Sequence, residues 1–450
     1  MDVIFEEKHS GKGIVRSVCK SKDRPKWSMI VEDNQYKDDR IKFSSWFSIY
    51  QMFKEVFLPR GYPDSVSSDY LSYQIWDSLQ AFGSSITGTL ATHNVLKGIG
   101  VGDQSATVTS ATLTWLLKDG TGMIGRIVFT YFKGSNLDVD CKKWRLYADI
   151  SNDFAIGLDM ICPMFPNYLL LLQCSSGLIK SLVGTIGGAT RAALTQHQAR
   201  NNNLADVSAK DSSQETLVNL VALITSLILV PLVAESDSLV WILFVIFTIT
   251  HIYCNYRAVR SVKMEIFNPS RWTSFIEKYI FKETIGSVDE INQLENIWFF
   301  STHQFQDRIE SGLPLSDHDL SDEQFDRLNE NLHNNNYILS VNGQHNVLIS
   351  FFDGQESVRT KMEAYFHGNL ILFALTDQKK AQSLGITIND HEELKLDSIV
   401  KSTRSIVDSK FDQMLTNAMD KGWNLSNFIF LENGWRVKSR DSRISDKKSN

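Results

Sequence analysis

Charged side chains recur inside a part of the sequence that is otherwise rich in glycine and apolar residues. Arg145, Asp149 and Asp153 follow one another at four-residue spacing, so a helix would carry all three on one face. Ionisable groups beside apolar segments often mark a binding site or a pathway at a membrane. The pattern therefore predicts a polar site, and Asp159, Lys180 and Arg191 follow the same logic. A solvated helix face is the alternative.

A second polar group surrounds a glycine-rich segment that has the formal pattern G-x-G-x-x-G. Its members are Lys118, Asp119, Gly120, Gly122, Gly125 and Arg126. A dinucleotide-binding loop needs a strand before this pattern and an alternation of strands and helices after it. Here residues 142–158 are predicted to form a helix and no alternation follows, so the context disfavours an enzyme that uses a nucleotide. Two interpretations remain: close packing of helices, or a glycine-rich helix N-terminus that binds an anionic phosphate beside Lys118 and Arg126.

The clearest structural signal is a pair of uncharged segments, Leu217–Val233 and Leu239–Cys254, joined by the turn Ala234–Ser238. At 1.5 Å per residue each helix would reach roughly 25 Å, and a few flanking residues would complete a span of a ~30 Å hydrocarbon core. We predict a transmembrane helical hairpin, with the lipid bilayer as its surroundings. The second segment leads into Arg257, Arg260 and Lys263, so the positive-inside rule places both long flanks in the cytosol.

Residues 79–194 contain apolar stretches between clusters of small residues, a composition that favours close helix association in lipid. A tightly packed soluble helical core is the alternative. The predicted fold is mainly α: an N-terminal segment 1–45, a glycine-rich helical membrane-associated core 46–265, and a small soluble α+β domain 270–438. The charged tail 439–450 is predicted to be disordered.

Within the C-terminal domain, strands are predicted at Tyr337–Val341, Asn346–Phe352 and Phe428–Val437. Asn342-Gly343 between the first two is a strong hairpin signal. Helices are predicted at Val358–Leu375 and Leu396–Met419, which gives the order strand-strand-helix-helix-strand.

Composition excludes several classes of function. The 450 residues have a formal net charge of -6, which gives no electrostatic basis for nucleic-acid binding. The 5 cysteines are scattered and never form a CxxC pair, so neither a zinc site nor a disulfide framework is expected. No P-loop, HExxH or Ser-His-Asp pattern is present. We therefore expect no enzymatic activity, no metal and no catalytic cofactor.

Four strings resemble the root UVB sensitive (RUS) family: residues 57–66 (FLPRGYPDSV), 69–80 (DYLSYQIWDSLQ), 115–126 (WLLKDGTGMIGR) and 144–154 (WRLYADISNDF). The resemblance covers roughly residues 40–265 and, more loosely, the C-terminal part. The N-terminus has neither a secretory signal nor a transit-peptide pattern, so the chain is expected to resemble the animal-type, non-plastid members.

The resemblance implies a membrane-associated protein with a link to vitamin B6 homeostasis, and plant members are also associated with UV-B responses and auxin transport. It brings no catalytic residues. The polar positions of the family strings, which add Asp77 to the residues above, are the candidates for a ligand site. We expect a non-enzymatic membrane protein that handles or transports a small polar metabolite, with pyridoxal phosphate or a related vitamer as a candidate ligand. A membrane-anchored scaffold whose C-terminal domain recruits a protein partner is the alternative.

Overall fold

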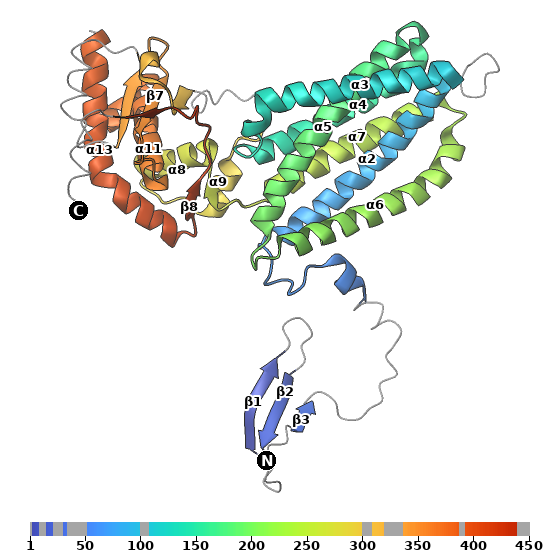
Figure 1. The fold of residues 1–450 in the computed structure, drawn as a ribbon, viewed down its shortest axis with the longest axis horizontal. Helices are drawn as coiled ribbons and strands as arrows, with labels where there is room; N and C mark the ends of the chain where they lie inside the picture. Colours follow the sequence, from blue (N-terminus) through green and yellow to red (C-terminus); the bar gives the residue numbers. More distant parts are fainter. Residues whose placement is uncertain are drawn as a thin grey trace. The chain divides into compact units, whose positions relative to one another are not determined.

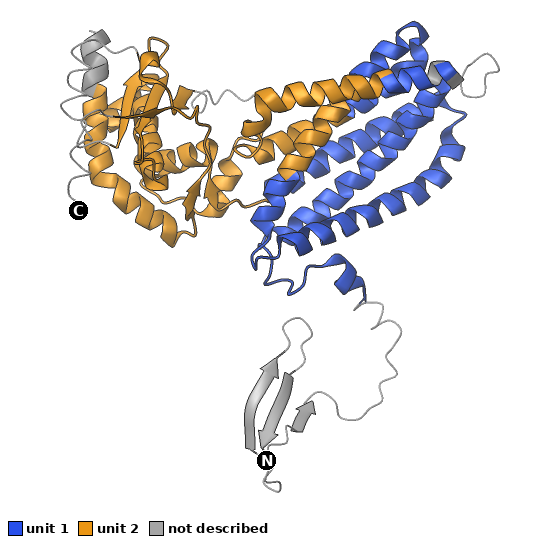
Figure 2. Cartoon of the chain, viewed as in Figure 1, with its two compact units in different colours: residues 1–116, 153–176, 191–261 blue, residues 117–152, 177–190, 262–450 orange. Residues whose placement is uncertain are grey.

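A computed structural model describes residues 52–99, 108–298, 308–318, 336–386 and 392–438, together with three strands near the N-terminus. The chain is mainly helical (Figure 1). It divides into two compact units, coloured in Figure 2. Unit 1 comprises residues 1–116, 153–176 and 191–261, and unit 2 comprises residues 117–152, 177–190 and 262–450. The long helices α3, α4 and α5 each contribute residues to both units.

Six long helices form the first two thirds of the described chain. They are α2 (Tyr70–Ile99), α3 (Val108–Lys133), α4 (Cys141–Ile161), α5 (Leu169–Gln198), α6 (Leu204–Val233) and α7 (Asp237–Ser261). The uncharged segments seen in the sequence lie inside α6 and α7. Both helices are longer than expected, and the predicted turn Ala234–Ser238 is shorter, because α7 already begins at Asp237. Two prolines, Pro163 and Pro166, lie where short 3-10 turns separate α4 from α5.

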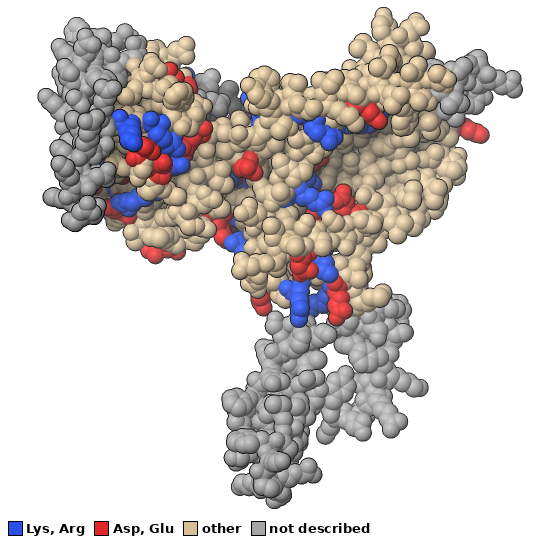
Figure 3. Space-filling view, viewed as in Figure 1, with Lys and Arg blue, Asp and Glu red and all other residues tan. Residues whose placement is uncertain are grey.

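Within the part of the chain that the structure describes, three helical segments are long and apolar enough to cross a membrane: Pro166–Gln198, Leu204–Val233 and Asp237–Ser261. Of the most apolar 18-residue stretch in each segment, only 17%, 17% and 22%, respectively, is buried inside the chain. Large side chains such as Leu227 on α6 and Ile249 on α7 are 68% and 63% exposed. On the face in Figure 3, broad areas without charge separate scattered charged side chains over the helices. These helices therefore present an apolar surface that the chain itself does not cover.

Helix packing in unit 1 depends on close backbone approach. A Cβ added to Gly83 on α2 would lie 3.3 Å from the carbonyl oxygen of Phe247 on α7. Ile86 and Leu90 of α2, Ile156 and Met160 of α4, and Phe244 of α7 belong to one buried cluster. The helices of this unit thus share an apolar interior into which any polar side chain must bring its own partner.

The glycine pattern of α3 lies in the middle of that helix, which runs from Val108 to Lys133. The prediction of a helix N-terminus at this point is wrong: backbone amides in a helix interior are already bonded within the helix. The packing interpretation fits the structure. A Cβ on Gly122 would lie 3.1 Å from the carbonyl oxygen of Gly177, and one on Gly125 would collide with Leu178, both on α5.

The C-terminal part of unit 2 is an α+β arrangement. Its elements are β4 (Ile266–Phe267), α8 (Pro269–Phe281), α9 (Val288–Leu294), β5 (Ile309–Ser311), β6 (Tyr337–Val341), β7 (Val347–Phe352), α11 (Val358–Thr376), α12 (Gln378–Ser383), α13 (Glu392–Asp420), β8 (Asn424–Phe428) and β9 (Arg436–Val437). Strand β7 is the centre of the sheet: it pairs with β6 antiparallel on one side, and with β5 and β9 in parallel on the other. All six of its residues are buried.

Most sequence predictions for this part are confirmed, since β6, β7, α11 and α13 lie where they were expected. The single strand predicted at Phe428–Val437 is wrong. Strand β8 ends at Phe428 and pairs with β4, whereas β9 begins at Arg436 and pairs with β7. Gly434, with a φ of 80°, lies between them and permits the change of direction.

Near the N-terminus, β1 (Asp2–Lys8), β2 (Val15–Lys20) and β3 (Ile30–Asp33) form an antiparallel sheet. Residues 52–57 are helical, and the tail 439–450 lies outside the described residues.

Two glycines of α3 allow a matched test of helix packing. We expect Gly122→Leu to destabilise the protein by about 1–3 kcal/mol, because its side chain would overlap the α5 backbone. Gly120→Ala, where nothing lies within 4 Å, should be neutral or stabilising by up to about 1 kcal/mol, since alanine favours helix. Thermal unfolding of the purified full-length protein measures both. Equal midpoints for the two variants would contradict close α3–α5 packing.

Candidate functional site

Two of the polar residues predicted on α3 lie against α5. Lys118 packs against α5, where a Cβ on Gly177 would lie 2.5 Å from the Lys118 Cγ. The Nε of Arg126 donates to the Oγ of Ser181, 3.3 Å away and also on α5. Asp119 is exposed. Lys118 and Arg126 therefore both face α5, and their role in ligand binding stays a prediction.

The three predicted residues of α4 separate into two interactions. Arg145 and Asp149 form an ion pair, with 3.7 Å between Nε and Oδ2. Asp153, one turn further on, is 5% exposed and contacts His251 of α7. On α2, Asp77 accepts hydrogen bonds from the hydroxyl of Tyr73 and the amide of Gln80, both at 3.2 Å.

The Asp153–His251 pair lies inside unit 1. The Nδ1 of His251 is 2.9 Å and 2.8 Å from the two carboxylate oxygens of Asp153. His251 is 1% exposed. His251 is a histidine in a long stretch of α7 that has no charged residue. A histidine in such a stretch is the signal in the sequence that could have identified it. Its partner could not be read from the sequence, because 98 positions separate the two residues.

A second buried carboxylate, Asp159, lies further along α4 and is 3% exposed. Its Oδ1 accepts a hydrogen bond of 3.0 Å from the Nε2 of Gln173 on α5. The same amide nitrogen is 3.1 Å from the sulfur of Cys162. The sequence indicated Asp159 but not Gln173.

A third buried carboxylate, Asp211 on α6, is 8% exposed. It accepts from the Nε of Arg191 on α5 at 2.6 Å and from the Nε2 of Gln74 on α2 at 3.1 Å. Arg191 also reaches Glu215 at 2.7 Å, nearer the surface. This cluster ties three helices of unit 1 together. Neither Asp211 nor Gln74 was among the predicted site residues.

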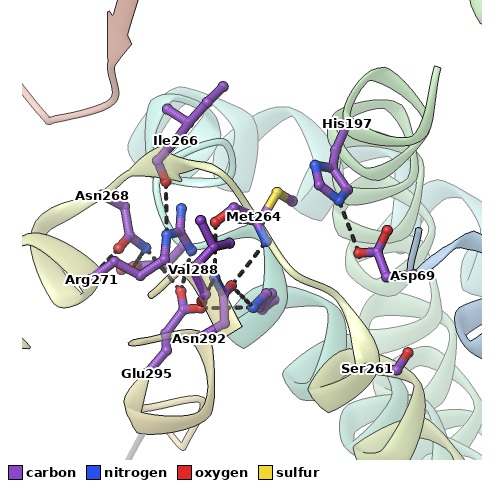
Figure 4. Close-up of polar contacts among 12 residues, drawn as sticks. Asp69, His197, Ser261, Met264, Ile266, Asn268, Arg271, Val288, Asn292 and Glu295 are labelled. Carbon is purple, nitrogen blue, oxygen red and sulfur yellow. Dashed lines mark hydrogen bonds and ion pairs between the residues drawn. The ribbon is translucent and has the colours of Figure 1, made fainter. Parts of the chain in front are cut away.

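The fourth is Asp69, which directly precedes α2 and is 3% exposed. Figure 4 shows its carboxylate pointing at the imidazole of His197, near the end of α5. The Nε2 of His197 lies 2.9 Å from Oδ2. His197 was not among the predicted site residues.

Among its described residues, unit 1 thus holds four buried aspartates, each paired with a side chain from another element. An ionised carboxylate in an apolar interior is costly unless it is paired, and a hydrophobic pair is often as stable as a buried ion pair. Stability alone does not explain four such groups among helices that are apolar outside. Buried ionisable groups among apolar helices often mark a functional site in membrane proteins.

Another buried polar cluster lies in unit 2, where its side chains bind one another in the fold. In Figure 4, Glu295 approaches Arg271 and Asn268, and Asn292 contacts the backbone of Met264. Glu295 binds Arg271 at 2.5 Å and Lys142 of α4 at 2.9 Å, and each of these three side chains is at most 4% exposed. Burial alone raises the pKa of Glu295, but Arg271 and Lys142 outweigh it and lower the pKa to about 2.

This cluster predicts a specific acid sensitivity. The folded-state pKa of Glu295, about 2, is below its ordinary value of 4.5, so its stabilisation is complete above pH 4.5 and is lost as the pH falls towards 2. We expect Glu295→Gln to lower the free energy of unfolding by roughly 3–5 kcal/mol near neutral pH, since two cations lose their buried partner. The variant should also lose less stability than the wild type between pH 4.5 and 2.

Unfolding of the full-length protein, followed by tryptophan fluorescence at several pH values, measures both effects. Glu290→Gln is the control, because Glu290 also pairs with a lysine, Lys278, but is 54% exposed. The cluster would have no such role if the two variants gave the same midpoint.

Within the described residues, no group of three or more His, Cys, Asp or Glu side chains is placed to hold a metal ion. The fold and the buried groups together define a mainly helical protein with three helices long and apolar enough to cross a bilayer, followed by an α+β part.

Comparison with known proteins identifies the family. Residues 44–283 match the model of the vitamin B6 photo-protection and homoeostasis domain, and residues 284–439 match the root UVB sensitive protein C-terminal model. The chain belongs to the root UVB sensitive (RUS) family. Its expected animal-type character stays a prediction.

Two curated relatives show the extent of the similarity. RUS family member 1 of Dictyostelium discoideum is 50% identical over 270 residues, which cover 58% of this chain and about half, 51%, of that relative. Protein root UVB sensitive 3 of Arabidopsis thaliana is 30% identical over 447 residues, covering 94% of this chain and 96% of the relative. No solved structure matches the chain.

Proposed function

We propose that this protein is a multi-pass membrane protein that binds a small polar metabolite of the vitamin B6 class and moves it through unit 1. The observation that carries the proposal is the set of four buried aspartates inside a unit whose outer helices are apolar. A bilayer would cover those outer faces, and the inner carboxylates with their partners would supply hydrogen bonds to a solute that has left water. The role is one of binding and transport rather than catalysis.

The ligand class is supported by the family. The matching domain is described by vitamin B6 photo-protection and homoeostasis. B6 vitamers carry hydroxyl groups and a ring nitrogen, and these can exchange hydrogen bonds with carboxylates, amides and imidazoles. A vitamer would act here as the cargo and not as a catalytic cofactor.

The number of membrane crossings follows from the positions of the helix ends. If only α5, α6 and α7 crossed, the segment before Pro166 and the segment after Ser261 would lie on opposite sides. Cytosolic placement of both flanks, as the basic residues after α7 suggest, needs an even number of crossings. Helix α2 has 30 residues and α3 has 26, long enough at 1.5 Å per residue to cross as well. We propose that α2 to α7 all cross, alternating in direction.

Single-cysteine labelling in intact and permeabilised membranes tests this topology, using the full chain with its native cysteines replaced. Exposed positions at the helix ends are suitable: Ser135, Asn167, Asn201, Ser238 and Lys282. Six crossings predict that positions 135, 201 and 282 share one side and that 167 and 238 share the other. Three crossings would move position 135 to the side of 167. A hairpin anchor alone would leave 238 by itself across the membrane, and would favour the scaffold alternative.

Ligand binding tests the site itself. We expect Asp153→Asn and Asp159→Asn each to weaken binding of tritiated pyridoxine or pyridoxal phosphate at least about tenfold, a loss of about 1.4 kcal/mol per site. Asp119→Asn is the control, because Asp119 is exposed on α3. Equilibrium dialysis of the purified full-length protein measures the affinity.

The outcomes separate the candidate sites. If joint neutralisation of Lys118 and Arg126 abolished binding while Asp153→Asn did not, the site would lie on the α3 side instead. If the wild type bound neither probe, the B6 ligand would be wrong.

A further inference from the structure

Two of the four buried aspartates have a histidine as partner: Asp153 pairs with His251, and Asp69 pairs with His197. The other two are held by Arg191 and Gln173, whose charge does not change near neutral pH. Imidazole is the side chain that ordinarily gains or loses a proton in that range. Of these four pairs, the two that contain imidazole are therefore the candidates for binding a proton.

The Asp153–His251 pair is the more deeply placed of the two. His251 follows the start of α7 at Asp237 by about 21 Å of helix and precedes its end at Ser261 by about 15 Å. Asp153 likewise lies well inside α4, which runs from Cys141 to Ile161. With exposures of 1% and 5%, neither side chain reaches solvent in this arrangement.

The surroundings of the pair are tightly packed and largely apolar. A Cβ on Gly83 of α2 would be 3.5 Å from the Cβ of His251, and one on Gly157 of α4 would be 3.9 Å from the ring of Phe244 on α7. On α5, the hydroxyl of Ser176 donates to the carbonyl of Ala155, one turn from Asp153, at 3.0 Å. Four helices, α2, α4, α5 and α7, therefore contribute to the pair and its immediate neighbours.

The other charged groups on these helices have partners of their own. On α2, Asp77 accepts from Tyr73 and Gln80. On α4, Asp149 pairs with Arg145, and Asp159 with Gln173. On α5, Lys180 lies one turn after Ser176 and also has an interaction of its own, while Cys254 on α7 is a buried thiol.

We propose that the Asp153–His251 pair is a proton-binding site, and that a proton bound there crosses together with the metabolite. With a neutral imidazole the pair carries a net charge of -1, and with a protonated imidazole its net charge is zero. In an apolar interior this difference is large, because buried charge is poorly screened. Binding the proton therefore changes the electrostatic free energy of the contact between α4 and α7.

This inference rests on the proposed function and adds the driving ion to it. A neutral vitamer moving with one proton carries one positive charge, so a proton gradient would drive its accumulation. Proton release restores the pair to its charged form, and atoms and charge are conserved in the cycle.

The first test measures proton binding without any metabolite. The full-length protein, labelled with ¹⁵N-histidine and held in lipid nanodiscs, is titrated from pH 5 to 8, and the His251 signals are assigned with His251→Gln. We expect the ring to change between one and two bound protons within this range. The exposed His345 serves as an internal reference for a solvated ring. A His251 ring that keeps one protonation state throughout would overturn the proposal.

The second test measures coupling. Proteoliposomes containing the wild type are given tritiated pyridoxine with and without a pH gradient of one unit, acidic outside. We expect the gradient to raise accumulation by up to about tenfold, the limit for one proton per molecule. Asp153→Asn should abolish the response to the gradient, while Lys97→Gln, which removes an exposed ion pair with Asp237, should retain it.

The outcomes distinguish the two proposals. Uptake by the wild type that ignores the gradient would overturn proton coupling and leave transport intact. If the wild type took up no pyridoxine under either condition, the transport proposal would fail, and the ring titration alone would then decide whether His251 is a proton site.

Discussion

The pairing of buried carboxylates across helices is the constraint on which the rest of unit 1 depends. Each of Asp69, Asp153, Asp159 and Asp211 must be met by a donor from another helix, because an unpaired carboxylate in an apolar interior would cost several kcal/mol. Meeting this requirement fixes which helices lie side by side and in what register. The apolar contacts around Ile86 and Phe244 then fill the space between the pairs. Polar groups inside and apolar groups outside are the reverse of the usual arrangement in a soluble bundle, and they fit a protein whose solvent is lipid.

Small residues make that arrangement possible. Gly83 lets α2 approach the His251 segment of α7, and Gly122 lets α3 approach α5. Without such contacts the donors would be held too far from the carboxylates for hydrogen bonds of about 3 Å. Unit 2 uses a different solution: Glu295 pairs with two cations in a closed cluster, and the same unit contains an aromatic core with Phe267 stacked on Trp423. The separate carboxylate pairs of unit 1 fit the proposed binding of a ligand, whereas the closed Glu295 cluster of unit 2 fits a structural role.

The sequence predicted what local patterns determine. Asn342-Gly343 located the β6–β7 hairpin, and the four-residue spacing of Arg145, Asp149 and Asp153 placed them on one helix. It failed where the partner is distant. His251 follows Asp153 by 98 positions, and no local pattern joins them. The glycines of α3 left two interpretations open, because glycine signals both helix ends and close packing, and only the neighbouring α5 distinguishes the two.

The central claim is that the apolar outer helices face lipid while the carboxylate pairs remain enclosed. An electron cryo-microscopy map of the full-length protein in a lipid nanodisc tests it most directly. We expect a belt of lipid density against the exposed side chains of α6 and α7, such as Leu227 and Ile249. We also expect Asp153 and His251 to be in contact within the protein. A map with these helices outside the belt, their apolar faces covered by a second copy of the chain, would contradict it.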